Sequence, residues 1–303
     1  MHRLGLLGRT VKLLLLATIS NPLAVHGNIN REDLCGLSVN ASEFPGIGKF
    51  SSIEGIWTIP KMIPRGDETS SQSSYISSGV SLCCGEDCST RLSAGFLAWD
   101  PDPGELYTAS PMIQITPQFD TRGIYNTRLH LNASDTLWTR LEIRSPTLAS
   151  ITFTKLETST SNITVTVDID VGQKNGVLDM KIYRDEDKAP SNWSFPIRFG
   201  NLTAPSLCGD SAWWYLSDEY DLSDWIERVN PLARFTPVLI SGHGLGTTEG
   251  KSFPADLPLS GQAQFWDMVR GGDGQTGEMQ LCKVRGFVDT GMTLLQSPQP
   301  WGV

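Results

Sequence analysis

Asp210-Ser211-Ala212-Trp213-Trp214-Tyr215-Leu216-Ser217-Asp218 is the stretch on which the predicted fold depends. It places three large aromatic side chains in a row between short polar residues. Successive side chains of a β-strand point to opposite faces, so Trp213 and Tyr215 share one face and Trp214 takes the other. Aromatic rings are mostly kept from water. The stretch therefore predicts a strand covered on both faces, either as core of a two-layer β protein or with one face as the floor of a cleft.

Further segments with strand character follow one another along the chain, separated by turn residues such as Pro64-Arg-Gly-Asp67. They comprise residues 50–59, 73–82, 91–99, 128–131, 136–143, 148–156, 162–169, 177–183, 212–217, 237–241, 264–270 and 281–289. Only 222–229 could form a helical turn or two, and the glycine-rich segments 242–250 and 271–277 predict long surface loops. We predict an antiparallel all-β fold, a single β-sandwich or flattened-barrel domain over residues 28–303 with N- and C-terminal extensions.

The first 27 residues have the composition of a secretory signal peptide. Basic residues lie between His2 and Lys12, an apolar run follows at 13–19, and Val25 and Gly27 suit the positions before a cleavage site. The apolar run is too short to span a membrane. We predict a secreted protein, or one in the lumen of the secretory pathway, with no membrane span.

Sequons and cysteines agree with that location. Asn-x-Ser/Thr sequons, which predict exposed glycosylated sites, occur at Asn40, Asn132, Asn162, Asn192 and Asn201. The six cysteines are Cys35, Cys83, Cys84, Cys88, Cys208 and Cys282, an even number that predicts disulfides in an oxidising compartment, with the pairing left open. The run 83–88 has no nearby histidine, so we expect no metal there. The formal charge of -9 argues against nucleic acid as a partner.

Short motifs in a fixed order resemble the fungal glutamic peptidases, the eqolisin family of concanavalin A-like β-sandwiches. Ser52-Ile-Glu-Gly-Ile-Trp-Thr-Ile-Pro60 is similar to that family's opening strand, Gly-x-Trp/Phe-Thr-Val-Pro. Tyr75-Ile-Ser-Ser-Gly-Val80 lies where the family has Trp-Val-Gly-Ile-Asp-Gly, and Arg91-Leu-Ser-Ala-Gly-Phe96 where it has Ile-Leu-Gln-x-Gly-Val. The resemblance implies the same sandwich fold.

Four later motifs continue the resemblance, which spans roughly residues 50–242. Tyr107-Thr-Ala109, ending at Pro117, is similar to Tyr-x-Ala-Trp-Tyr-Glu-Trp-x-Pro, and Asn132-Ala-Ser-Asp-Thr136 to a Pro-Gly-Asp turn. Ala212-Trp-Trp-Tyr-Leu216 corresponds to Ala-Glu-Trp-Ile-Val, and Pro231-Leu-Ala-Arg-Phe-Thr-Pro-Val238 to the closing Leu-Pro-x-Phe-x-x-Val.

Departures from the family pattern change the expected function. The family's Gln and Glu are held to activate water and stabilise the tetrahedral intermediate, which requires an acid/base group. In this alignment Ser93 stands at the Gln position and Trp213 at the Glu position, and neither side chain can do that work. The resemblance therefore implies a diverged member without peptidase chemistry.

Strand alternation then predicts the lining of a remodelled cleft. We expect catalytic roles for Arg91, Ser93 and Tyr215 and ligand contacts from Trp213, Met112, Gln114 and Trp99. An apolar floor with a guanidinium, a phenol and an amide suits a hydrophobic small molecule bearing a carbonyl or oxyanion.

Other chemistries find weaker support. No Gly-x-Ser-x-Gly motif accompanies His130 or His243, the histidines beyond the signal peptide, so a serine hydrolase is not expected. Asp168 and Asp170 share a strand face, as the paired carboxylates of a glycosidase would, but they end their strand beside a glycine turn, where acidic residues usually meet water. Asp100 and Asp102 fit a plain turn better than a calcium site.

We therefore predict a cofactor-free enzyme that cyclises or cycloadds an apolar substrate by holding it in a reactive geometry. By analogy of protein class alone, fungal secondary metabolism uses secreted glycoproteins for such hetero-Diels-Alder additions. Two alternatives stay open. One is a non-catalytic glycan-binding sandwich, and the other is a diverged acid endopeptidase in which Gln114 with Glu105 or Glu219 restores a dyad.

Overall fold

The computed structural model describes residues 29–31, 34–63, 75–85, 88, 90–99, 108–116, 122–123, 129–157, 162–172, 177–184, 191–196, 206–217, 234–253, 263–270, 279–287 and 292–296. The predicted signal peptide lies outside the described residues, as do segments 222–229 and 271–277. Within the described part, the chain forms strands and one short 3-10 helix, η1 (Ala41–Glu43).

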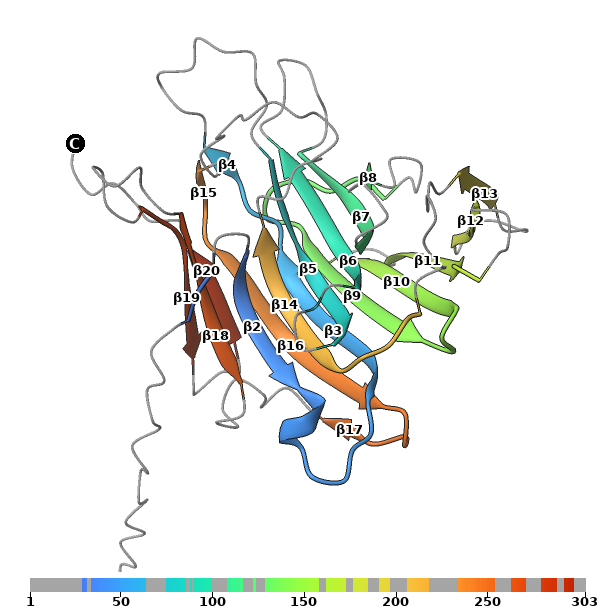
Figure 1. Ribbon diagram of the computed structural model, residues 1–303. Helices are drawn as coiled ribbons and strands as arrows, with labels where there is room; N and C mark the ends of the chain where they lie inside the picture. The colour runs from blue at the N-terminus through green and yellow to red at the C-terminus, as the bar shows by residue number, and fades with distance from the viewer. Residues whose placement is uncertain are drawn as a thin grey trace, which may run out of the picture.

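Sheet A forms one layer of the fold (Figure 1). Its antiparallel order is β8 (Arg122–Gly123), β7 (Ala109–Thr116), β6 (Thr90–Trp99), β5 (Tyr75–Cys84), β14 (Ser211–Ser217), β2 (Leu34–Asn40), β18 (Gln264–Arg270) and β19 (Met279–Phe287). Strand β1 (Ile29–Arg31) pairs in parallel with β18. The aromatic stretch β14 is thus an interior strand, flanked by β5 and β2.

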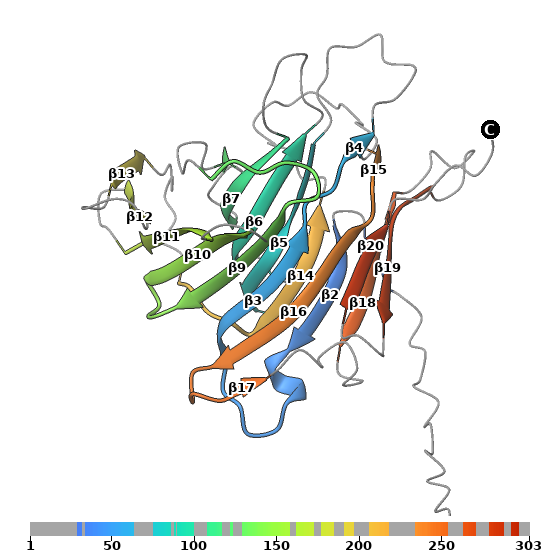
Figure 2. The ribbon, with the colours of Figure 1, turned by 180° about the vertical axis from the view of Figure 1, so that it is seen from behind.

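Sheet B forms the second layer, seen from behind in Figure 2. Its antiparallel order is β13 (Ser191–Pro196), β12 (Val177–Arg184), β11 (Ile163–Asp170), β10 (Leu148–Leu156), β9 (Thr136–Ile143), β3 (Phe50–Thr58), β16 (Val238–Thr247), β20 (Met292–Gln296) and β19. Strand β17 (Ser252–Phe253) pairs with the end of β16, and β4 (Met62–Ile63) pairs separately with β15 (Arg234–Phe235). Because β19 pairs with β18 and also with β20, it joins the two layers.

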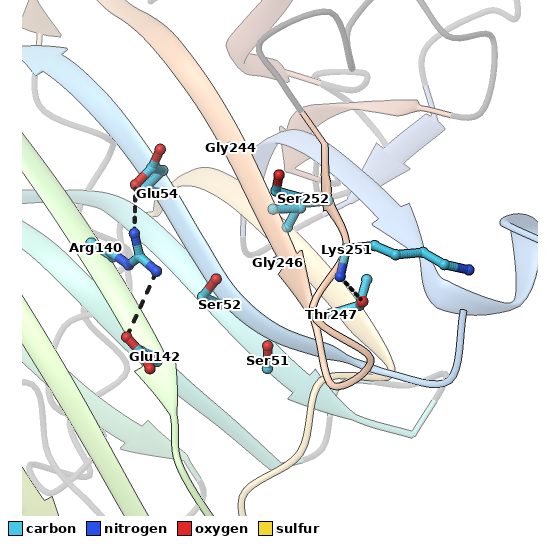
Figure 3. A pocket seen from close by; sticks show the side chains of 12 residues that line it. Ser51, Ser52, Glu54, Arg140, Glu142, Gly244, Gly246, Thr247, Lys251 and Ser252 are labelled. Atoms are coloured by element: carbon cyan, nitrogen blue, oxygen red, sulfur yellow. Dashed lines mark hydrogen bonds and ion pairs between the residues drawn. The ribbon is translucent and has the colours of Figure 1, made fainter. Parts of the chain in front are cut away.

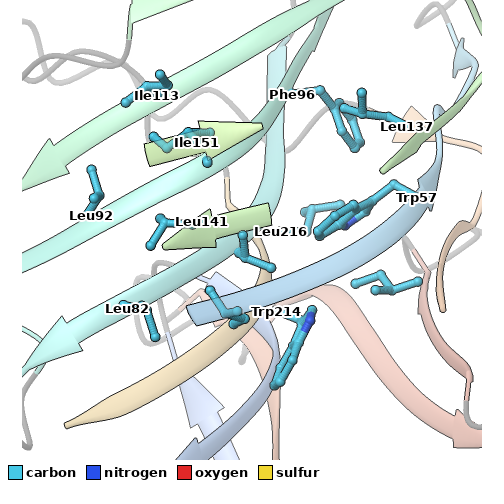
Figure 4. Close-up of a cluster of buried hydrophobic side chains, with 14 of the residues drawn as sticks. Trp57, Leu82, Leu92, Phe96, Ile113, Leu137, Leu141, Ile151, Trp214 and Leu216 are labelled. Carbon is cyan, nitrogen blue, oxygen red and sulfur yellow. The ribbon is translucent and has the colours of Figure 1, made fainter. Parts of the chain in front are cut away.

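The hydrophobic core lies between the sheets (Figure 4). Sheet A contributes Trp214 and Phe96, sheet B contributes Trp57 and Phe153, and all four are fully buried. Trp214 donates its indole N–H to the carbonyl of Glu54 across the layers at 2.8 Å. Fully burying one such apolar side chain stabilises the fold by roughly 1.5–3 kcal/mol, so this interface holds the sandwich together.

The predicted antiparallel all-β sandwich is confirmed, and the predictions for 136–143, 148–156 and 264–270 match β9, β10 and β18. Two local predictions were wrong. Residues 128–131 form no strand among the described residues and contribute an isolated bridge from Leu131 to Ala109. The glycine-rich segment 242–250 is not a loop throughout, because β16 continues to Thr247.

The outward-facing glycines explain the second error. An added Cβ at Gly244 would lie 2.6 Å from Glu54 Oε1, and one at Gly246 would overlap the hydroxyl of Ser52. Gly242 has a φ of +60° where the register shifts between Ser241 and Gly244. The glycines therefore belong to a bulged strand, where side chains of the neighbouring strand occupy the space that a Cβ would take, and they do not form a turn.

All six cysteines form disulfides, as predicted. The pairs are Cys35–Cys282, Cys83–Cys88 and Cys84–Cys208. The first joins β2 to β19, and the other two fix the end of β5. No helix in the described part of the chain is long and apolar enough to cross a membrane.

Candidate functional site

One face of sheet A carries all seven predicted site residues. The opposite face, which includes Trp214, belongs to the core. Strand pairing sets Ser93 opposite Gln114, Gly95 opposite Met112, and Cys83 opposite Arg91. Directly paired residues of neighbouring strands share a face. We call this surface the site face, and define it by Arg91, Ser93, Trp99, Met112, Gln114, Trp213, Tyr215 and the residues that alternate with them.

A continuous row of polar and aromatic side chains crosses the centre of the site face. In strand order it comprises Gln264, Ser38, Trp213, Ser81, Ser93 and Gln114. The hydroxyls of Ser81 and Ser93 are 2.7 Å apart and hydrogen-bonded. The two positions that the resemblance aligns with the family's Gln and Glu, Ser93 and Trp213, thus share one row with Ser81 between them.

Two tryptophan rings pack together beside Ser38: Trp213 belongs to this row, and Trp266 lies in the next row, opposite Gly36. The rings of Trp213 and Trp266 have centroids 5.2 Å apart at a tilt of 37°. Their indole N–H groups donate to Ser211 at 3.1 Å and to Ser38 at 2.7 Å. Since protein hydroxyls satisfy both N–H groups, the rings contribute apolar contact area to the face and no spare donors.

Tyr215 lies in the next row, between Gly36 and Gly79. The Arg91 guanidinium carbon is 5.7 Å from the centroid of the Tyr215 ring, within cation–π range. Glycines on both sides leave room for a large ring on a sheet, so packing alone accounts for Tyr215 being aromatic. The Tyr215 ring is therefore placed beside the Arg91 cation.

The site face is buried along most of its length. Ser93 and Met112 are fully buried, and the exposed fractions of Gln114 and Trp213 are 8% and 5%. Trp99 is half-buried at the end of β6. Hydrogen bonds and charges in such an environment act more strongly than in water. The hydroxyl of Ser110, also on this face, is buried and makes no hydrogen bond to the described residues.

An ion pair fixes the start of β14. Asp210 accepts a hydrogen bond from the Gly85 N–H at 3.0 Å, and the Lys49 ammonium lies 2.9 Å from its other oxygen. Burial opposes ionisation of this carboxyl, but the amide and the ammonium outweigh it and hold the pKa of Asp210 below its usual value. The same turn carries Cys208, whose disulfide reaches Cys84.

Residues considered for other chemistries lie elsewhere. His243 is fully buried and packs edge-on against Trp214 at 5.2 Å, whereas His130 is exposed outside the named strands. Asp168 is on sheet B, where Arg144 lies 3.5 Å away. Among the described residues no group of histidine, cysteine and carboxylate side chains could hold a metal ion. Asp100, Asp102, Glu105 and Glu219 lie outside the described residues.

The sequence matches the model of the Peptidase A4 family over residues 32–178. The protein is eqolisin-like. The fold of this eqolisin-like chain resembles scytalido-glutamic peptidase, solved with a transition state analog inhibitor, at a TM-score of 0.55 and 14% identity. It also resembles SCP-B, a member of the eqolisin family solved with the tripeptide Ala-Ile-His, at a TM-score of 0.53 and 12% identity. Each comparison covers 88% of this chain and 99% of the other. A comparison with curated proteins gives no match.

Sequence reasoning missed several residues of the site face, among them Ser38, Ser81 and Trp266. Ser81 belongs to a predicted strand, and alternation from Gly79 would have placed it on this face. Ser38 belongs to β2 (Leu34–Asn40), for which no strand was predicted. The approach of Trp266 to Trp213 depends on pairing between segments far apart in sequence.

Proposed function

We propose that the site face binds an apolar small molecule with a conjugated carbonyl group and promotes its cyclisation or cycloaddition. The observation that carries this proposal is that the site face has an aromatic part, Trp213 and Trp266, and a hydrogen-bonding part, which includes Ser93 and Gln114. The described residues of the site face include the Arg91 guanidinium and no carboxylate. An acid peptidase of the family type needs a carboxyl there, so the lining favours binding and orientation over hydrolysis.

The chemistry follows from these two parts of the site face. The rings of Trp213 and Trp266 hold the apolar part of the substrate, and the groups of Ser93, Gln114 and Arg91 donate hydrogen bonds to its oxygen. In a cycloaddition all new bonds form between the reacting partners, so no proton donor or cofactor is needed. Donors fixed in a buried site stabilise the negative charge that grows on the oxygen in the transition state. Holding two partners together removes several kcal/mol from the barrier.

The proposed setting is the secretory pathway or outside the cell. Three disulfides fit an oxidising compartment. We propose a role in secondary metabolism, with the substrate entering at the half-buried Trp99 end of β6.

Two measurements on the glycosylated secreted protein test the proposal. The first is cycloaddition of an ortho-quinone methide, generated in situ, with a cyclic sesquiterpene, followed by product ratio and enantiomeric excess. We expect the protein to give one enantiomer in excess, Gln114→Ala and Trp213→Phe to lose this selectivity, and Thr152→Ala on sheet B to keep it. A racemic product with every variant would contradict the proposal.

The second measurement is cleavage of denatured casein at acid pH. We expect no cleavage. Robust cleavage that disappears in Gln114→Ala would establish the diverged acid peptidase instead.

A further inference from the structure

The outward face of sheet B carries a half-buried tryptophan, Trp138, which does not belong to the core. Leu137 and Leu141 of β9 point into the core, so Trp138 and Arg140 point outward. Trp138 pairs with Ile56 of β3 and with Thr154 of β10. An indole on the outer surface of a sheet offers a flat apolar platform within a polar surface.

A polar groove of about 260 Å³ begins one row further along the sheet (Figure 3). Arg140 lies between Glu54 and Glu142, with nitrogen-to-oxygen distances of 3.7 Å to each. Gly244 and Gly246 leave the adjacent part of β16 without side chains. A sugar has an apolar C–H face and a rim of hydroxyls. The indole matches the apolar face, and the charged groups, the serine hydroxyls and the bare backbone of the groove match the hydroxyls.

Asn162 lies immediately before β11, at a position that alternates with the outward-facing residues of that strand. It begins the sequon Asn162-Ile163-Thr164 and its side chain is exposed. Its Oδ1 accepts a hydrogen bond from the Glu157 N–H at 3.2 Å, which fixes the amide while its nitrogen, the atom that carries an N-linked glycan, forms no hydrogen bond to the described residues. Asn40 differs, because its amide nitrogen donates to Glu43 at 3.4 Å.

Strand register sets the path from Asn162 to the platform. Thr164 pairs with Thr154, whose other neighbour is Trp138, and the two threonine hydroxyls are 3.2 Å apart. Two residues along a strand and two strand spacings give a separation of about 12 Å between Asn162 and Trp138. The first sugars of an N-linked glycan span such a distance.

We propose that the N-linked glycan of Asn162 binds its own protein. Its first sugars stack on Trp138, and the following ones enter the groove of Glu54, Arg140 and Glu142. This proposal is independent of the function proposed for sheet A.

Release of each glycan from the native protein by an amidase specific for N-linked glycans tests this, with site occupancy followed by mass spectrometry. We expect slow release from Asn162, and about three- to ten-fold faster release in Trp138→Ala, the factor expected for loss of one aromatic contact. Arg140→Ala should give a smaller increase. The Asn132 glycan, in the turn before β9, is the internal control and should be released at one rate in all variants. Heat-denatured samples should lose both glycans equally fast.

An Asn162 without glycan, or a release rate that Trp138→Ala leaves unchanged, would overturn the proposal. Should Trp138→Ala fail to fold, Trp138→Leu keeps most of the side-chain volume and removes the flat ring, and the same acceleration is expected.

Discussion

Replacing Gly79 with alanine tests whether close strand contact sets the shape of the site face. Gly79 of β5 lies opposite Gly95 of β6 and beside Tyr215 of β14. An alanine Cβ would lie 2.8 Å from the Gly95 Cα and closer still to the carbonyl of Ala94. Both are backbone atoms of a strand that is hydrogen-bonded on its two sides. The contact cannot be relieved by rotating a side chain.

The magnitude follows from two opposing terms. Overpacking of this kind costs about 1–3 kcal/mol, and more where the backbone cannot move. Alanine regains about 0.5–1 kcal/mol because its unfolded chain has less conformational freedom to lose on folding than that of glycine. We expect Gly79→Ala to lower the free energy of unfolding by about 2 kcal/mol or more.

Gly244→Ala is the matched control. It is also a glycine in a central strand with an ordinary φ, but its Cβ would meet the flexible carboxylate end of Glu54. We expect a change in unfolding free energy within about 1 kcal/mol. Urea unfolding followed by tryptophan fluorescence, with disulfides intact, gives both values. Equal midpoints for the two variants would refute the reasoning, because they would show that the strands around Gly79 separate freely.

Two further predictions concern the fixed ends of the strands. The pKa of Asp210 is lowered on folding, so its contribution to stability is present above the ordinary pKa of 3.8 and is lost as pH falls through the folded value. Asp210→Asn should therefore be less stable than wild type at pH 7, by under about 1 kcal/mol for this solvent-exposed pair. Urea midpoints of the variant and the wild type, measured down to pH 2, should converge. The two disulfides whose cysteines are 247 and 5 residues apart should contribute unequally to the free energy of unfolding. Chain entropy predicts about 5.5 kcal/mol for Cys35–Cys282 and about 2 kcal/mol for Cys83–Cys88, and thermal unfolding of the paired serine variants should show the larger loss for the first.

Local patterns were enough to predict most of the fold. Alternation along 162–169 and the run at 212–217 specify strands because the period of two is a property of the single strand. The division of Trp213 and Tyr215 from Trp214 follows from the same geometry, and the burial of Trp214 in the core bears it out. Strand alternation also placed Arg91 and Ser93 on one face, as observed.

Features that depend on pairing between distant segments could not be predicted. Glycines 242, 244 and 246 indicated a loop, because nothing in the local sequence shows that Glu54 and Ser52 occupy the space above them. The contact of Trp266 with Trp213 needs the β18–β2–β14 order, which no local pattern encodes. The cysteine pairing was left open for the same reason.

The place of β2 in sheet A has a consequence for how the protein is made. Strand β2 is among the first segments to leave the ribosome, yet its partners β14 and β18 and its disulfide partner Cys282 come from the last third of the chain. Neither sheet can complete its strand pairing while that part is untranslated, so the backbone N–H and C=O groups of β2 lack their strand partners during most of translation. Such delayed, long-range pairing makes folding slow and leaves nascent chains prone to association. Yield in any expression host should therefore depend on chaperones that hold the N-terminal half, more than on the rate of translation.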